Sequence, residues 1–556
     1  MDKKVILAIG LSLAVLVGWS LFFGPEKGQA PKGNEIAANS TSEEISKAPE
    51  SRVMTPFTPP HVTAKPESRI PQAGYEKEIE IDTPLYRAIF SNAGPTIRSF
   101  KLKKYRETTD PDSPFIELVS VEKNMGDFLI VGFNNLSAPE DTTLFCEVNH
   151  ESIQLGPESS PKDLVFHSIT PQGVSVRHTF RFHPDRYNIE LAVDVANQTG
   201  EAIRGSFISS LKAMPPQGKK SYYSYVGLVC LLNDKLEEVK IKKASEEKVL
   251  KGTINWLAYE DDYFLSAIVP EQKTSKGIFE ASLSPSGLLE GRYLPPTVLI
   301  TPSNQASSDY TLYLGPRELG ILKEGGKQLS KAVNFGWTDI IANPLLYTLR
   351  FFNQYINNYG VSIIFLTILI KILFWPLTHK SYKSMKEMQK LQPRMAKLRE
   401  KYKNNKEQLN KEMMGLYKTY KVNPMGGCLP MIIQIPVFFA LFRILGSCIE
   451  LRHAPFMLWI TDLAAPDRLF IFSFKIPFMA PPYGIPILTL LMGASMFIQQ
   501  KMTPTPGDPS QAKIMMFLPV IFTFMFINFP SGLVLYWLVN NILSIGQQYR
   551  IHRSPN

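Results

Sequence analysis

Long apolar runs occupy the start of this chain and its part after residue 354, and a region of alternating polar and apolar residues lies between them. Each run approaches the ~20 apolar residues that are needed to cross the hydrocarbon core of a bilayer. A Pro-Ser-Gly turn signal separates the last two runs, which are close to the minimum length. The pattern predicts a polytopic α-helical membrane protein with six transmembrane helices, five of them in a core at 354–556. The six runs are residues 5–23, 357–377, 428–447, 484–501, 513–528 and 532–548.

The stretch between the first two runs divides into two predicted parts. Residues 24–74 are rich in Pro, Ser, Lys and Glu and contain little to bury, which predicts a disordered linker. From Tyr75 onward, short runs rich in Ile, Val, Phe and Tyr alternate with polar residues at period two, between Asn, Gly, Pro and Asp breaks. Such alternation is typical of strands and hairpins. The pattern therefore predicts an all-β sandwich domain at residues 75–333.

Residues 334–353 precede the second run and mix aromatic and aliphatic side chains with Asp339 and Arg350. This mixture predicts an amphipathic helix in the membrane interface. Pro344 is expected to break or kink that helix. A simple extension of the following span is the alternative interpretation.

The distribution of charge predicts how the runs cross the membrane. The chain has a formal net charge of +10, and residues 378–424 carry 11 Lys and two Arg against four Glu. Lys3 and Lys4 precede the first run, whereas residues 24–334 are net acidic. Because positive residues flank spans on the cytoplasmic side, both termini are expected in the cytoplasm and the β domain outside.

The first run is longer than the apolar region of most signal peptides, and no convincing small-x-small cleavage site follows Phe23. Residues 28–30 are only a weak candidate for such a site. We therefore predict that residues 1–23 form an uncleaved signal-anchor helix, with a cleaved signal peptide as the alternative.

One charged residue, Lys371, stands inside the second run, six residues from its cytoplasmic end and therefore about 9 Å deep. A charge within hydrocarbon is costly, so an intramembrane lysine indicates a functional site. Thr367 lies one helical turn away on the same face. A lysine that snorkels to the headgroups is the alternative.

Polar residues also follow one side of the sixth run, and the third run contains Gln434. Lipid cannot satisfy polar stripes, so stripes on several spans face each other or a water-filled cavity. The pattern predicts a hydrated, positively charged groove that opens to the cytoplasm, with a self-satisfied polar helix interface as the alternative. The stripe consists of Tyr536, Asn540, Ser544 and Gln547.

The basic segment at 378–424 predicts a cytoplasmic hairpin of two amphipathic helices at 379–402 and 406–420, with a turn at Asn404 and Asn405. Its positive surface predicts docking of anionic lipid or of the RNA of a ribosome. A hairpin that merely satisfies the positive-inside rule is the alternative. No specific nucleic acid readout is expected, because interleaved aromatics and an RNA-binding motif are missing. The cations assigned to this surface are Lys383, Lys386, Lys390, Arg394, Lys397, Arg399, Lys401, Lys403 and Lys406.

Other classes of protein fit the sequence less well. It contains no GxxxxGK[ST], HExxH or GxSxG motif, and its eight histidines form no metal-spaced cluster, so we expect no catalytic site, metal or cofactor. A secondary transporter would show repeated halves and acidic residues within its spans, and neither occurs. A sugar-binding sandwich could use His178 and His183, which are more simply surface residues of a strand and its turn. Cys146 and Cys230 could pair in an oxidising compartment if the fold brings them together.

Four motifs carry a resemblance to a known family. They are KVNPMGGCLPMIIQIPVFFALF at 421–442, ELRHAPFMLWITDL at 450–463, MFIQQKM at 496–502 and FPSGLVLYWLVNN at 529–541. Together they resemble the YidC-type membrane protein insertases, whose relatives are the Oxa insertases of mitochondria and the Albino-type insertases of chloroplasts. The resemblance covers about residues 337–550, and the preceding anchor and β domain resemble the long bacterial form with a periplasmic domain.

The resemblance implies a protein of the bacterial inner membrane that inserts integral membrane proteins and helps them fold, alone or with the Sec translocon. Lys371 would be the groove charge that attracts acidic residues of a nascent membrane protein, with Thr367 beside it. Tyr536 and Trp537 would contact the substrate. The hairpin would receive the incoming chain and recruit the ribosome or the signal recognition particle pathway. The family usually has arginine where this chain has Lys371, so the charge is kept but the planar five-donor fork is lost.

Overall fold

The computed structural model describes residues 75–553 with internal gaps, so the predicted anchor at 1–23 and linker at 24–74 lie outside the described residues. The gaps are 120, 122–126, 136–144, 216–224, 242, 245, 272–275, 421, 423–428 and 504–508. Side chains are also left undescribed at 406, 429–433 and 509–514.

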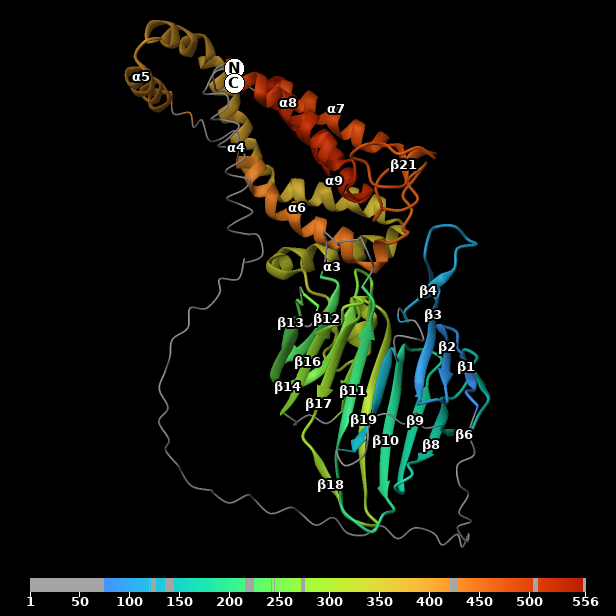
Figure 1. Cartoon of the computed structure of the whole chain (residues 1–556). Helices are drawn as coiled ribbons and strands as arrows, with labels where there is room; N and C mark the ends of the chain where they lie inside the picture. Colours follow the sequence, from blue (N-terminus) through green and yellow to red (C-terminus); the bar gives the residue numbers. More distant parts are fainter. Residues whose placement is uncertain are drawn as a thin grey trace, which may run out of the picture. The chain divides into compact units, whose positions relative to one another are not determined.

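The first part of the described chain is all-β (Figure 1). A five-stranded sheet has the order β4-β3-β2-β1-β7, in which only β1 and β7 run parallel. Its strands are β1 (Glu78–Asp82), β2 (Tyr86–Ser91), β3 (Thr96–Arg106), β4 (Phe115–Glu117) and β7 (Ser152–Gln154).

A second, 14-stranded sheet has the order β18-β11-β17-β16-β14-β15-β19-β10-β9-β8-β6, with β12 beside β14, β13 beside β12, and β5 beside β11. The strands from β5 to β12 are β5 (Leu129–Asn135), β6 (Glu147–Val148), β8 (Lys162–Ile169), β9 (Val174–Phe182), β10 (Asn188–Asn197), β11 (Ile203–Ala213) and β12 (Gly227–Leu232). The remaining strands are β13 (Lys235–Glu238), β14 (Glu247–Glu260), β15 (Phe264–Pro270), β16 (Lys276–Leu283), β17 (Leu289–Leu294), β18 (Val298–Ile300) and β19 (Gln305–Pro316).

The alternating sequence pattern explains how the two sheets share a core. In β10 the inward residues alternate strictly with more exposed ones, as period two requires. Phe90 of the five-stranded sheet packs on Phe166, Phe180 and Phe182 of the larger sheet, with ring centroids 5.1–6.3 Å apart. The two sheets therefore pack face to face, which confirms the predicted sandwich.

The prediction that His178 and His183 are surface residues is wrong. Both are buried. His178 continues the inward alternation of Phe180 and Phe182 along β9. The Nε2 atom of His178 lies 2.9 Å from the carbonyl of Val131, and burial lowers the pKa of His178 to about 4. A neutral histidine inside the core is therefore part of the packing.

Cys146 and Cys230 are both buried and do not form a disulfide with each other. Burial raises the pKa of the Cys230 thiol to about 12, which keeps it protonated and unreactive. The pairing that the sequence left open is therefore not formed.

Short helical segments lead from the sheets to the helices of the C-terminal part: α2 (Leu319–Glu324), η2 (Leu329–Ala332) and η3 (Gly336–Thr338). Helix α3 (Asp339–Ile356) follows and contains Pro344. It ends at Asn357, whose φ is +54°, and Asn358 caps the next helix by accepting a hydrogen bond from Val361 N at 3.0 Å. The alternative that this segment simply extends the next span is wrong, because two asparagines interrupt the helix.

Helix α4 (Tyr359–Lys401) is 43 residues long and continues without a break from the apolar second run into the basic segment. The hydroxyl of Thr378 donates to the carbonyl of Phe374 at 3.0 Å, at the level of Pro376. Helix α5 (Lys406–Thr419) follows, with Asn405 as its N-cap. The first half of the predicted hairpin is therefore the continuation of α4, and its second half is the separate helix α5.

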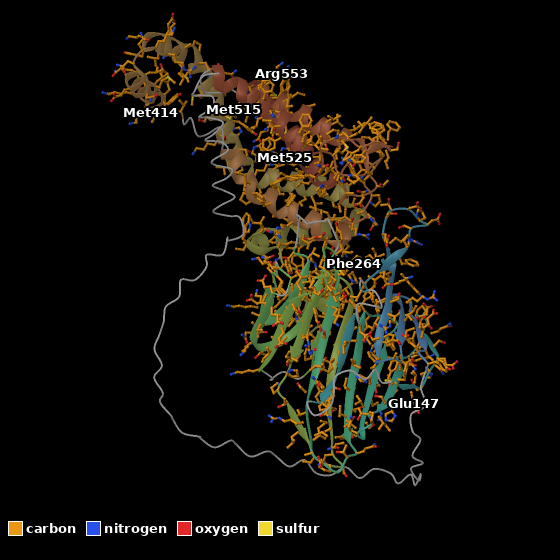
Figure 2. All side chains as sticks on the ribbon, in the orientation of Figure 1. Glu147, Phe264, Met414, Met515, Met525 and Arg553 are labelled. Atoms are coloured by element: carbon orange, nitrogen blue, oxygen red, sulfur yellow. The ribbon has the colours of Figure 1, made fainter. Side chains whose placement is uncertain are left out.

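The other helices are α6 (Leu429–Ser447), α7 (Ile487–Met502), α8 (Pro509–Phe526) and α9 (Ser531–Arg553) (Figure 2). Between α6 and α7 lie η5 (Ile449–Leu451) and the two strands β20 (Leu469–Phe472) and β21 (Tyr483–Ile485), which pair antiparallel. Helix α9 packs against α4, α6 and α7, and α3 packs against α4 and α6. Within the described residues, only α4 is both long and apolar enough to cross a membrane, so the number of six spans stays a prediction.

Candidate functional site

Lys371 lies where α4 packs against α9. Its Nζ atom donates to the hydroxyl of Ser544 at 2.6 Å, and that hydroxyl donates in turn to the carbonyl of Asn540 at 2.7 Å. Because the serine proton is used within its own helix, the oxygen's lone pairs remain for the ammonium group. Thr367, one turn earlier on α4, is completely buried and donates to the carbonyl of Ile363 at 2.6 Å. The structure therefore brings Lys371, Thr367, Asn540 and Ser544 to one seam between two helices.

The charge of Lys371 is not neutralised within the described part of the chain. An ammonium group has three donors, and Ser544 receives one of them. No described carboxylate forms an ion pair with Lys371. The side chain is half-buried, so a positive charge that can accept an acidic partner lies at this seam.

Other polar residues of α9 find partners among their neighbours. The amide of Gln434 on α6 donates to the Tyr536 hydroxyl at 3.3 Å, and the amide of Gln547 donates to Thr378 at 3.0 Å. These contacts match the alternative of a self-satisfied polar helix interface. Lys371 differs from them because its charge has no carboxylate partner among the described residues.

Trp537 lies on a different face of α9 from Ser544. Its ring centroid is 5.2 Å from that of Phe438 on α6 and 5.3 Å from that of Phe526 on α8. Consecutive helical residues point about 100° apart, so Trp537 enters an aromatic cluster while Tyr536 turns to Gln434. The structure therefore does not bring Trp537 together with Lys371.

Comparison with known proteins identifies the family. The family model described as 60Kd inner membrane protein matches residues 351–556, and that described as YidC periplasmic domain matches residues 78–348. The membrane protein insertase YidC of Syntrophus aciditrophicus is 43% identical over 562 residues, 100% of each chain. That of Geobacter sulfurreducens is 42% identical over 559 residues, 100% of this chain and 99% of the relative.

The chain belongs to the YidC family.

A solved structure of an active YidC insertase with its first transmembrane domain resolved is 17% identical, with a TM-score of 0.38, and the match covers 86% of this chain and 93% of that one. In this member of the YidC family, the β sandwich occupies the part that the periplasmic domain model matches, and α4 to α9 occupy the other part.

The basic hairpin of this YidC family member has an apolar inner side and a charged outer side. Met388, Leu391 and Met395 of α4 pack on partly buried apolar residues of α5. Lys386 donates to the carbonyl of Ile551 at 3.2 Å, and Arg394 lies over the ring of Tyr420. Among the predicted docking cations the exposed ones are Lys383, Lys390, Arg394, Lys397, Lys401 and Lys403, whereas Lys386 and Arg399 are half-buried. The side chain of Lys406 is outside the described residues.

The helical part also contains polar contacts that no sequence pattern indicated. Asn541 donates to Ser495 of α7 at 3.0 Å, and Arg350 of α3 forms an ion pair with Glu450. Asp467 accepts from the indole of Trp459 at 2.6 Å and from Leu488 N at the start of α7. Asp467 lies 21 positions before Leu488 in the chain, so no local capping pattern indicates that its carboxylate stabilises the first turn of α7.

Proposed function

We propose that this chain is a membrane protein insertase of the bacterial inner membrane, with six spanning helices, both termini in the cytoplasm and the β domain in the periplasm. Its relatives carry the name membrane protein insertase. The observation that carries the proposal is the ammonium group of Lys371, held by Ser544 in a buried seam without a described carboxylate partner. No catalytic step, metal or cofactor is part of the proposal.

In the proposed mechanism, Lys371 attracts an acidic residue in the extracytoplasmic tail of a nascent membrane protein. The polar groups beside Lys371 form the wall of a hydrophilic groove that is open to the cytoplasm and to lipid. Burial of a segment of ~20 apolar residues in the bilayer drives insertion, and the groove lowers the cost of moving a short polar tail through hydrocarbon. The groove residues in this proposal are Thr367, Lys371, Gln434, Tyr536, Asn540 and Ser544.

The apolar segment of the substrate leaves the groove along α6 and α8 in this proposal. Ile435 of α6 and Phe517 and Phe524 of α8 are exposed apolar side chains on these helices, which supports a lipid-facing exit. Trp537 connects α9 to α6 and α8 through its aromatic contacts and would meet the substrate on this side.

The proposed partners follow from charge and location. The exposed cations of the hairpin would receive nascent chains and bind the ribosome, the signal recognition particle pathway or anionic lipid. The β domain would assist contact with the Sec translocon. Specific readout of a nucleic acid sequence is not proposed.

The decisive experiment is insertion of a single-span protein with an acidic N-terminal tail into proteoliposomes that contain only this full-length chain. We expect Lys371→Ala to lower the protease-protected fraction roughly tenfold, because a hydrogen bond to a charged group contributes about 1.5–3 kcal/mol. Lys371→Arg should preserve insertion, and Lys251→Ala, which removes an exposed lysine from the β domain, is the matched control.

Equal insertion by the parent and the Lys371 variants would contradict the electrostatic groove. If insertion does not exceed that of protein-free liposomes, the hypothesis of an autonomous insertase is wrong. The chain would then be an accessory chaperone that needs the translocon.

A further inference from the structure

The loop between α6 and α7 carries an unusual number of exposed apolar side chains. We call residues 469–485, which include β20 and β21, the outer hairpin. Phe470 is 69% exposed, Phe474 62% and Phe478 91%. Large apolar residues at such exposure mark an interaction surface when they are contiguous rather than scattered.

The outer hairpin is fixed at its base by Arg468. The guanidinium group uses all five of its N–H donors, which is the full capacity of an arginine side chain. Such a side chain has no freedom to leave its site without losing several hydrogen bonds. The acceptors, at 2.7–3.4 Å, are the carbonyls of Asp467, Ala480, Pro482 and Ile527 and the Oδ1 atom of Asn528.

Asn528 completes this attachment from the turn between α8 and α9. Its amide donates to the carbonyl of Phe478 at 2.9 Å, and its Oδ1 atom accepts from Ala480 N at 2.8 Å. Ser531 N at the start of α9 donates to the carbonyl of Ala465 at 2.7 Å. The outer hairpin is therefore held at the level where α8 ends and α9 begins.

That level is expected to lie within the edge of the hydrocarbon layer. Helix α7 has 16 residues and is therefore about 24 Å long, whereas the hydrocarbon core is about 30 Å thick. The difference corresponds to about four residues of helix. Since β21 ends at Ile485 and α7 begins at Ile487, the outer hairpin is the segment that can occupy the missing depth on this side. The apolar surface continues onto α7, where Leu490 and Leu491 are exposed.

We propose that the outer hairpin is a lipid anchor that inserts Phe470, Phe474 and Phe478 among the acyl chains of the outer leaflet. Lys475 is the single charged residue of residues 469–485 and is exposed at the same tip. A lysine there can place its ammonium at the phosphate level while its stem stays in the apolar layer. The inference rests on the membrane orientation of the proposed function and adds a lipid contact that the insertion mechanism does not require.

Photocrosslinking in proteoliposomes of the full-length chain tests the anchor. The variant Phe478→p-benzoyl-phenylalanine replaces one exposed aromatic ring by another, and adducts are identified by mass spectrometry. We expect a phospholipid adduct at position 478. Phe517→p-benzoyl-phenylalanine on α8 is the positive control for lipid contact, and Ser303→p-benzoyl-phenylalanine, at an exposed position of the β domain, is the negative control.

Each outcome decides the question. Lipid adducts at 478 and 517 but not at 303 support the anchor, whether or not the same proteoliposomes insert a substrate. A lipid adduct at 517 with no adduct at 478 overturns the anchor and leaves the proposed orientation intact. A protein adduct at 478 overturns it in favour of a docking site for substrate or a second copy. No lipid adduct at either position overturns the anchor together with the proposed arrangement in the membrane.

Discussion

Ser544 is the residue on which the position of the Lys371 charge depends. Its hydroxyl accepts from the ammonium at 2.6 Å, and among the described residues it is the single hydrogen-bond partner of that group. A serine in an apolar helix is usually satisfied by its own backbone, as Ser544 is through Asn540. The same hydroxyl also accepts a hydrogen bond from Lys371 of the neighbouring helix α4.

We predict that Ser544→Ala lowers insertion of an acidic-tailed substrate, and by less than Lys371→Ala does. The charge stays but loses one hydrogen bond of about 1 kcal/mol, which is roughly a fivefold effect. The measurement is the protease-protected fraction in proteoliposomes. Ser495→Ala is the matched control, since Ser495 accepts a hydrogen bond from Asn541 and does not contact Lys371. An equal loss in both serine variants would assign the effect to helix packing.

At Glu260 the β domain contains a buried carboxyl group whose ionisation should affect stability. Burial raises its pKa from about 4.5 to about 7, although Arg317, with Nη1 3.3 Å away, opposes the shift. Glu238 and Asp261 raise it further. Because the folded state binds this proton more tightly than the unfolded state, the stabilising contribution is complete below pH 4.5 and is lost as the pH rises to 7.

Glu260→Gln should therefore remove part of the pH dependence of unfolding. From the two pKa values the loss in the parent is on the order of 3 kcal/mol between pH 4.5 and pH 8. This loss of stability is measured by hydrogen exchange of β14, β15 and β19 in the full-length chain across that pH range. Glu247→Gln, at the exposed start of the same strand, is the control and should behave like the parent. An unchanged pH profile in Glu260→Gln would show that another group titrates.

At the scale of elements, α4 joins two segments to which the sequence pattern assigns separate proposed roles. Its apolar half carries Lys371 and its basic half forms one side of the hairpin, without a helix end between them. A continuous helix of this kind would couple the position of the proposed docking surface to the proposed groove, although Pro376 and Pro393 interrupt its hydrogen-bond ladder. The charged half is held by packing of Met388 and Met395 on α5 rather than by ion pairs alone.

Neutralising exposed hairpin cations should weaken binding of ribosomes to nanodisc-held protein. Each lysine near an anionic surface contributes about 1 kcal/mol, and the salt dependence should become shallower with fewer cations. Cosedimentation over a salt series measures both. Equal weakening by the control set would mean that net charge alone is responsible. The test set is Lys383→Gln, Lys397→Gln and Lys403→Gln, and the control set in the β domain is Lys101→Gln, Lys235→Gln and Lys251→Gln.

For the whole molecule, the charge distribution predicts that the hairpin and the β domain lie on opposite sides of one membrane. Asn404→Cys and Ser303→Cys place thiols at exposed positions of these two parts. In intact spheroplasts, a membrane-impermeant maleimide should label Ser303→Cys and reach Asn404→Cys only after lysis. Labelling of both before lysis would contradict the topology. Both variants carry Cys428→Ser, which removes the fourth native thiol, and background is low at Cys146, Cys230 and Cys448, because they are buried.

Local signals account for the elements that the sequence predicted well. Period-two alternation placed the strand β10, and Asn404 and Asn405 marked the end of one hairpin helix and the cap of the next. His178 shows the limit of that reasoning. Its position in the alternation indicated burial, but its polar side chain suggested the surface, and the carbonyl of Val131 on another strand satisfies it.

By itself, the sequence determined the elements and the family, because apolar length, alternation, caps and motifs are properties of neighbouring residues. Only the tertiary structure decided which faces meet. Lys371 and Ser544 are 173 positions apart, and Gln434 and Tyr536 are 102 apart. The rotation of a helix about its axis depends on side-chain packing against several neighbours at once. For that reason Trp537 lies in an aromatic cluster away from Lys371, although it follows Tyr536 in the chain and the resemblance assigned both residues to substrate contact.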